Sequence, residues 1–294
     1  MFEKTVKIGA REVGEGHPVF VVAEAGDNHN GDVKLALRLI EEAARTGVDA
    51  VKFQIFRTEE LVCRAAPKAS YQRQGDPHPD QYSMLKALEL PFAVFPMLRR
   101  EAEQRGLIFL CSAFGFESQQ FLIRELGVPA LKIPSGELVN DEFLHQACSA
   151  RLPLILSTGM GTRQEVEDAL HLVYDAGCRH LVLLHATSAY PCPASDVNLR
   201  ALSTLMRIFN GPVGFSDHTT GNTARLEAVA LGAVLIEKHF TLDRALPGPD
   251  HAASTTPEEM KALVEQIRFL EQALGDGVKA PRPAERDVRE VARK

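Results

Sequence analysis

Long apolar runs are absent from this sequence. No stretch approaches the roughly 18 consecutive apolar residues that span a bilayer, and the opening segment MFEKTVKIGA has no continuous apolar core. We therefore expect a cytoplasmic protein without a membrane partner.

Cysteine is scarce, and its spacing is irregular. The sequence has five cysteines and no CxxC pair; they are Cys63, Cys111, Cys148, Cys178 and Cys192. An odd number without paired spacing argues against a disulfide framework and against a structural zinc site. The pattern is typical of a protein in a reducing compartment.

The sequence also lacks a strong charge of either sign. Its 33 Lys and Arg against 39 Asp and Glu give a formal net charge of −6, with 45% hydrophobic and 24% charged residues. This composition is that of an ordinary globular protein, and it does not favour nucleic acid or an anionic membrane as a partner. Local groups must therefore hold any anionic ligand.

Short aliphatic or β-branched runs alternate with helical patterns along the chain. The eight runs lie at 19–23, 50–53, 107–111, 130–133, 153–156, 181–184, 212–215 and 234–236. The helical patterns lie at 32–46, 91–105, 117–126, 141–151, 162–176, 198–209, 222–232 and 257–274. This alternation predicts an α/β fold, a (β/α)8 TIM barrel, with a doubly wound open sheet as the alternative.

Three segments fall outside the repeated pattern. Residues 1–18 predict a short β-hairpin that closes the amino-terminal mouth of the barrel domain, which we assign to residues 1–275. Residues 57–80 form a long polar segment without apolar periodicity, typical of a lid or a substrate-contacting loop. Residues 276–294 are charged and contain proline, so we expect a linker or tail.

Two histidines follow neighbouring apolar runs near the end of the chain. His218 comes after the run at 212–215, and His239 comes after the run at 234–236. The carboxyl ends of neighbouring parallel strands deliver their side chains to one rim. The two imidazoles are therefore candidate ligands of one shared metal ion.

Two lysines lie inside otherwise apolar strand sequence. A buried lysine such as Lys52 or Lys132 is costly unless an anion meets it. Hydroxyls follow other runs at Ser135, Ser157 and Ser216. Two cations and several neutral donors suit a small phosphorylated carboxylic acid.

Eight motifs together resemble the sialic acid synthase family, which includes N-acetylneuraminate, legionaminic acid, pseudaminic acid and spore-coat polysaccharide synthases. They are AEAGDNHNG (23–31), VKFQ (51–54), LKIPSGE (131–137), LSTGMG (156–161), HATSAYPCP (185–193), GFSDHT (214–219), EKHFTLD (237–243) and GPDH (248–251). The resemblance is collinear from about residue 18 onward.

The resemblance implies condensation of phosphoenolpyruvate with an open-chain amino-aldose, giving a 2-keto-3-deoxy sugar acid and phosphate. It implies a divalent cation, typically Mn2+, at His218 and His239. By the same resemblance Glu137 manages the proton of the attacking water. The remaining implied contacts are Lys52, Ser112 and Lys132 to the carboxylate, Ser135, Ser157, Ser188 and Ser216 around the phosphate, and Glu24, Gln54, Tyr190 and Asp250 to the sugar.

Two features depart from the family pattern. Ser188 stands where many members have asparagine, and the sequence stops at residue 294, where the antifreeze-like domain of such enzymes would begin. The resemblance implies a homodimer, and we expect the antifreeze-like domain to have been removed, to be supplied by a separate protein or to be unnecessary for the acceptor. Two alternatives stay open: an octulosonate- or heptulosonate-phosphate type synthase, for which Arg57 and Arg73 could bind a second phosphate, and a non-catalytic sugar-acid-binding barrel.

Overall fold

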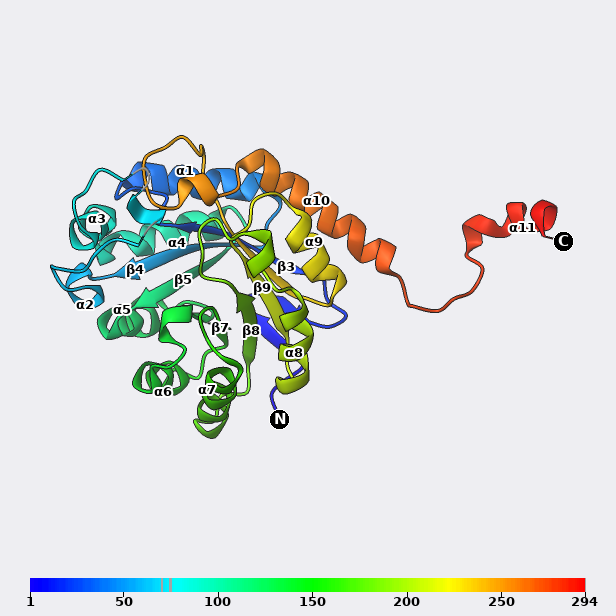
Figure 1. Ribbon diagram of the computed structural model, residues 1–294, viewed down its shortest axis with the longest axis horizontal. Helices are drawn as coiled ribbons and strands as arrows, with labels where there is room; N and C mark the ends of the chain where they lie inside the picture. The colour runs from blue at the N-terminus through cyan, green and yellow to red at the C-terminus, as the bar shows by residue number, and fades with distance from the viewer. Residues whose placement is uncertain (70, 74–75, 294) are drawn as a thin grey trace.

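Eight parallel strands close into a barrel in the computed structural model, which describes residues 1–69, 71–73 and 76–293. Around the barrel the order is β10-β3-β4-β5-β6-β7-β8-β9. The strands are β3 (Phe20–Gly26), β4 (Ala50–Phe56), β5 (Ile108–Phe114), β6 (Leu131–Ile133), β7 (Leu154–Ser157), β8 (Leu181–Ala186), β9 (Val213–Asp217) and β10 (Leu235–His239). The predicted TIM barrel is therefore confirmed (Figure 1).

Every strand begins within one residue of its prediction, but most strands run further than predicted. β4, β5 and β10 each extend three residues beyond the predicted end, β10 as far as His239. The apolar runs revealed only the part of each strand that is apolar. Several polar residues expected to follow the strands, among them Gln54, Ser112 and His239, are therefore part of the strands, so their direction is fixed by the sheet.

The helices surround the barrel and pack on its outer face. They are α1 (Val33–Thr46), α4 (Phe95–Gln104), α5 (Phe116–Phe121) with the π-helix η3 (Leu122–Leu126), α6 (Asp141–Ser149), α7 (Arg163–Asp175), α8 (Arg200–Ile208), α9 (Thr223–Ala230) and α10 (Pro257–Leu274). Asp32 and Asn140 cap α1 and α6, and Thr162 with Glu165 forms a capping box on α7. These caps set where each helix begins.

The long segment after β4 is not entirely a loop. It contains the helix α2 (Thr58–Leu61) and the 3-10 turn η1 (Tyr71–Arg73), and it leads into α3 (Gln81–Leu88), which the sequence analysis did not predict. Residues 70, 74 and 75 lie outside the described residues. Met84, Leu85 and Leu88 of α3 pack with Phe56 in a small separate core, so α3 is held against the end of β4.

A two-stranded hairpin closes the amino-terminal mouth, as predicted. β1 (Thr5–Ile8) pairs antiparallel with β2 (Arg11–Gly14). Val6, Ile8 and Val13 of the hairpin pack in one buried cluster with the inward-facing residues of the barrel strands, among them Phe20 and Leu235. The amino-terminal half of the barrel interior is therefore filled by apolar side chains, and only the carboxyl-terminal half has room for a site.

The carboxyl-terminal tail extends away from the barrel (Figure 1). It contains α11 (Arg286–Ala292), a short helix that the sequence analysis did not predict and whose residues are all exposed. Within the described part of the chain, no helix is long and apolar enough to cross a membrane.

Candidate active site

The inside of the barrel changes from apolar to polar halfway along the strands. Side chains two residues apart point the same way in a strand, so Glu24 stands above Val22, Lys52 above Ala50, and Ser112 above Leu110. The same alternation gives an inward polar layer made of Glu24, Lys52, Ser112, Lys132, Ser157, Ser216, Glu237 and His239, all of them buried. Most of the predicted site residues on the strands thus meet in one layer.

Lys52 lies among carboxylates and a hydroxyl. Its Nζ is 2.8 Å from Glu24 Oε1 and 3.6 Å from Glu237 Oε2, and it donates a 2.9 Å hydrogen bond to Ser112 Oγ. Burial opposes the charged ammonium, but Glu237 and Glu24 outweigh burial and raise the pKa of Lys52. Lys52 is therefore a permanent cation in this layer.

Lys132 lies on the other side of Glu237. Its Nζ donates a 2.7 Å hydrogen bond to Ser157 Oγ and lies 3.9 Å from Glu237 Oε1. Burial, and more weakly the charge of Lys52, lower the pKa of Lys132 to about 8 despite the attraction of Glu237. The two lysines thus differ: Lys52 stays charged, whereas Lys132 is close to losing its proton.

Glu237 is a site residue that the sequence analysis did not select. Burial opposes its charge, but Lys132, Lys52 and the 2.9 Å hydrogen bond from Ser216 Oγ lower its pKa. The sequence did carry a signal: Glu237 stands two residues before His239 and must share its face. Lys238, between them, points outward and donates to the carbonyl of Thr219 at 2.6 Å.

Two of the predicted phosphate contacts converge beside one glycine. Ser135 Oγ accepts a 3.0 Å hydrogen bond from the amide of Gly159. A Cβ added at Gly159 would lie 2.8 Å from Ser135 Oγ and would also collide with Ser188 Oγ. No side chain fits at position 159, and this glycine lets the loops after β6, β7 and β8 approach one another.

His218 and His239 face each other, with ring centroids 5.5 Å apart. The Nδ1 atom of His218 lies 2.6 Å from the carbonyl oxygen of Thr187, which fixes Nδ1 as the donor and leaves the Nε2 lone pair for a ligand. Burial lowers the pKa of His218 to about 4 and the pKa of His239 well below its usual value. Both imidazoles are therefore neutral, as metal ligands must be.

His239 also carries an orphaned polar atom. Its Nδ1 is buried and has no hydrogen-bond partner among the described residues, with Asp250 Oδ2 3.4 Å away. A divalent ion would satisfy such a nitrogen, so the pair fits the predicted metal. In the described part of the chain, no cluster of three or more His, Cys, Asp or Glu side chains could hold a metal.

Three of the four predicted sugar contacts line a cavity of about 360 Å³ beside His239. Gln54, Tyr190 and Asp250 lie in its wall together with His239, and Gln54 donates a 3.0 Å hydrogen bond to Glu24. The other lining residues come mainly from the segment after β4 and are Asp27, Phe56, Leu61, Val62, Gln72, Gln81, Met84, Leu85, Phe114 and Pro249. The long segment thus supplies a wall of the site, as expected of a substrate-contacting loop.

Glu137 lies at the edge of this arrangement. It is half-buried in the short 3-10 helix η4 (Ser135–Glu137), and its Oε2 accepts a 2.7 Å hydrogen bond from Asn140. The carboxylate that lies between the two lysines is Glu237. The role of Glu137 as proton acceptor stays a prediction.

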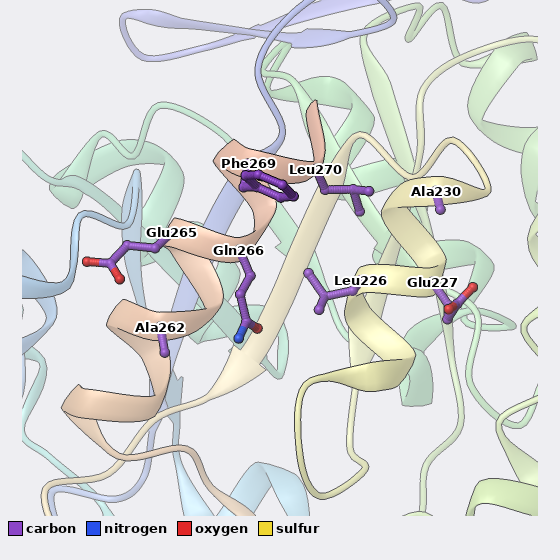
Figure 2. Close-up of a pocket in the computed structure, with 8 residues that line it drawn as sticks. All are labelled: Leu226, Glu227, Ala230, Ala262, Glu265, Gln266, Phe269 and Leu270. Carbon is purple, nitrogen blue, oxygen red and sulfur yellow. The ribbon is translucent and has the colours of Figure 1, made fainter. Parts of the chain in front are cut away.

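A second hollow lies on the outside of the barrel, between α9 and α10 (Figure 2). It measures about 560 Å³, and Leu226, Phe269 and Leu270 form its apolar part while Glu227 and Glu265 stand at its rim. None of the predicted site residues lines it. The predicted site residues therefore lie at the barrel mouth and not in this hollow.

Comparison with known proteins identifies the family of this chain. Residues 39–279 match the NeuB family. The chain is 47% identical to the N,N'-diacetyllegionaminic acid synthase of Legionella pneumophila over 97% of this chain and 82% of that protein. It is 36% identical to the human N-acetylneuraminate-9-phosphate synthase over 94% of this chain and 76% of that protein.

A solved structure gives the same result. The N-acetylneuraminic acid synthetase of Leptospira borgpetersenii, solved in complex with citrate, superposes with a TM-score of 0.86 at 34% identity, covering 100% of this chain and 99% of that chain. The match spans the whole barrel and every strand that carries the inward polar layer. The chain therefore belongs to the NeuB family, and like its named relatives it is a synthase.

Proposed function

We propose that this enzyme condenses phosphoenolpyruvate with the open-chain form of an uncharged amino-aldose, in a reaction that depends on a divalent cation. The products are a sialic-acid-like 2-keto-3-deoxy sugar acid and phosphate. The observation that carries the proposal is the joint burial of Lys52 and Lys132 beside the facing pair His218 and His239.

The charges of the inner layer support the need for a cation. Lys52 and Lys132 carry two positive charges, and Glu24 and Glu237 offset them when ionised. Phosphoenolpyruvate brings about three negative charges at neutral pH, because its phosphate resembles that of a phosphorylated side chain and it adds a carboxylate. Because burying that excess without a counter-charge is costly, a divalent ion at the histidines would restore much of the balance.

Separate groups of residues bind the carboxylate, the phosphate and the cation. Lys52, Ser112 and Lys132 hold the carboxylate, and Ser135, Ser157, Ser188 and Ser216 surround the phosphate. His218 and His239 would hold the cation, whose contribution is Lewis-acid polarisation of the aldehyde. Fixing both substrates in reacting geometry removes much of the entropic barrier.

The bond changes follow from this arrangement. Carbon 3 of phosphoenolpyruvate attacks the aldehyde carbon and forms the new C–C bond, which leaves positive charge at carbon 2. Water adds to carbon 2 and loses one proton to Glu137, and this proton passes to the alkoxide formed from the aldehyde oxygen. The bond between carbon 2 and the phosphate oxygen then breaks, phosphate leaves with the proton of the remaining hydroxyl, and the ketone forms.

The acceptor pocket favours an uncharged sugar with apolar substituents. Phe56, Val62, Met84 and Phe114 supply apolar wall, and none of the described lining residues is a lysine or arginine. A phosphorylated acceptor would need such a cation. Arg57, a candidate for that role, instead pairs with Glu117 at 3.1 Å and stacks on Phe92 at the surface.

A phosphate-release assay tests the proposal. Purified enzyme is incubated with phosphoenolpyruvate, Mn2+ and aldoses of five to seven carbons, each with and without N-acetylation and with and without a terminal phosphate. We expect phosphate release with uncharged N-acylated aldoses, and none without the aldose. Release only with phosphorylated acceptors would favour the octulosonate- or heptulosonate-phosphate type, and no release with any aldose would favour a binding protein.

A further inference from the structure

Two cysteines that the proposed chemistry does not use meet at the opposite end of the barrel. Cys148 lies in the last turn of α6, shortly before β7 begins, and Cys178 lies between α7 and the start of β8. Both are free and buried, at 5% and 9% exposure. They are 30 positions apart in the sequence, so only the packing of α6 against α7 brings them together.

The two cysteines share a cavity, and their side chains are close enough for each to shift the pKa of the other. Cys178 Sγ also donates to the carbonyl of His180 at 3.7 Å. Both cysteines line a hollow of about 700 Å³ whose rim includes the exposed residues Ser149, Arg151 and His180. A small solute can therefore approach sulfur atoms that a bulky reagent would not reach.

The backbone around each sulfur is fixed by helix-ending turns. The amide of Cys178 donates to the carbonyl of Val173 at 3.1 Å, after Gly177 in the left-handed region at φ 87°. The carbonyl of Cys148 accepts from the amide of Arg151 at 3.1 Å. The proximity of the two thiols thus belongs to the fold and is not an accident of two mobile loops.

The electrostatic surroundings divide the roles of the pair. The interaction with Cys148 lowers the pKa of Cys178 against the opposing effect of burial, with smaller contributions from the backbone at His180 and from Arg179. The same interaction and burial raise the pKa of Cys148. Arg179 is itself held, stacked 3.6 Å from the centroid of Tyr174. Cys178 is therefore the better nucleophile, and Cys148 keeps its proton.

We propose that Cys178 is a peroxide-reactive thiol and that Cys148 resolves its oxidised form into a reversible intramolecular disulfide. Hydrogen peroxide, or a small hydroperoxide of the same class, is the oxidant. The cavity admits it and the nearby Cys148 thiol supplies the second sulfur.

The steps balance with peroxide as the only co-reactant. The Cys178 thiolate attacks one peroxide oxygen, so an S–O bond forms, the O–O bond breaks, and the departing hydroxide takes up the proton that Cys178 released. Cys148 then attacks the sulfenic sulfur of Cys178, so the S–S bond forms and the S–O bond breaks. The second oxygen leaves as water with the proton of Cys148, and two thiols have reduced one peroxide.

The bond would act on the stability of the barrel and not on its chemistry. It would tie the end of α6 to the entry of β8, at the mouth that the hairpin closes, while the inward polar layer lies at the other end of the strands. Glu3 donates its amide to the carbonyl of Arg179 at 3.0 Å, so the start of the hairpin is anchored beside the same turn. A cross-link that closes a loop in the chain restricts the unfolded state.

The experiment uses the full chain with Cys63→Ser, which removes the exposed cysteine. The folded protein is treated with hydrogen peroxide, blocked with an alkylating agent in denaturant, digested and analysed by mass spectrometry. We expect the loss of two alkylatable thiols, a cross-linked peptide pair joining Cys148 to Cys178, and full recovery of both thiols with dithiothreitol. In the Cys63→Ser/Cys148→Ala protein, dimedone is expected to label Cys178.

Three results would overturn the proposal. Cys148 and Cys178 could both stay alkylatable at a peroxide dose that oxidises Cys63 in the unmodified protein. Dimedone could label Cys111 or Cys192 in place of Cys178. The oxidised protein could unfold at the same or a lower temperature than the reduced protein, which would reject the stabilising bond. The first and third results come from protein with both Cys148 and Cys178 intact, so a folding defect of a variant at either position cannot affect them.

Discussion

Glu237 Oε2 lies 3.6 Å from Lys52 Nζ inside the barrel, and the other oxygen of the same carboxylate lies 3.9 Å from Lys132. One buried carboxylate is thus shared by both lysines that are expected to bind the anionic substrate. Because Glu237 is two residues before His239 on β10, it also joins the anion site to the histidine pair. This arrangement makes substrate charge and metal charge interdependent, and the first prediction follows from it.

Removal of divalent ions is expected to weaken the binding of phosphoenolpyruvate by about 5- to 150-fold, the usual range for coupling between two sites. Isothermal titration of the enzyme with phosphoenolpyruvate, with Mn2+ or with EDTA, measures the difference. Glu237→Gln removes one negative charge and is expected to reduce this difference in phosphoenolpyruvate affinity between Mn2+ and EDTA. Equal affinity in Mn2+ and EDTA would contradict the charge-balance argument.

His218→Ala and His239→Ala are each expected to lower metal-dependent turnover by more than about 100-fold, because each removes one of two protein ligands. Circular dichroism should show the fold retained. His171→Ala, which changes an exposed histidine on α7, is the matched control and should keep full activity. Full activity in either site variant would reject the metal assignment.

Lys132→Ala is expected to raise the KM for phosphoenolpyruvate by roughly 30-fold, since loss of a buried charge partner costs about 2 kcal/mol or more. The KM for the sugar should change far less. Steady-state kinetics with each substrate varied in turn separates the two effects. The exposed Lys34→Ala is the control, and equal changes in both KM values would count against the anion site.

The kcat/KM for phosphoenolpyruvate is expected to fall as pH rises through about 8. Burial lowers the pKa of Lys132 to about 8 in the free enzyme, so the cation that binds substrate is present below this pH and is lost above it. Bound phosphoenolpyruvate stabilises the cation and should move the decline in kcat to higher pH. A decline at the same pH in both parameters would show that another group causes it.

Gly159→Ala is expected to impair phosphoenolpyruvate binding. A Cβ at this position would lie 2.8 Å from Ser135 Oγ and would collide with Ser188 Oγ, and overpacking typically costs about 1 to 3 kcal/mol. Gly136→Ala is the matched control, because nothing lies within 4 Å of its added Cβ. The KM for phosphoenolpyruvate in the two variants gives the comparison, and equal values would contradict the convergence of the two serines.

The sequence by itself determined the barrel, the helix caps and most of the inward polar layer. Alternating apolar runs and helical patterns are local signals, and Asp32, Asn140 and Thr162 act on amides within three residues, so each could be identified without a tertiary context. Lys52 and Lys132 stood out because a lysine in an apolar strand needs a partner. Their partner, Glu237, also carried a local signal through the two-residue period to His239, but that signal was not used.

Tertiary structure alone decided which distant groups meet. The acceptor cavity joins Leu61 and Met84, from the segment after β4, to Asp250, which lies more than 160 positions later in the sequence. Cys148 and Cys178 line one cavity only because α6 packs beside α7. Local sequence patterns indicate the secondary structure of each residue and whether its side chain points inward or outward. Contacts between distant segments depend on how the closed barrel places the loops around its rim. No short stretch of sequence encodes this placement.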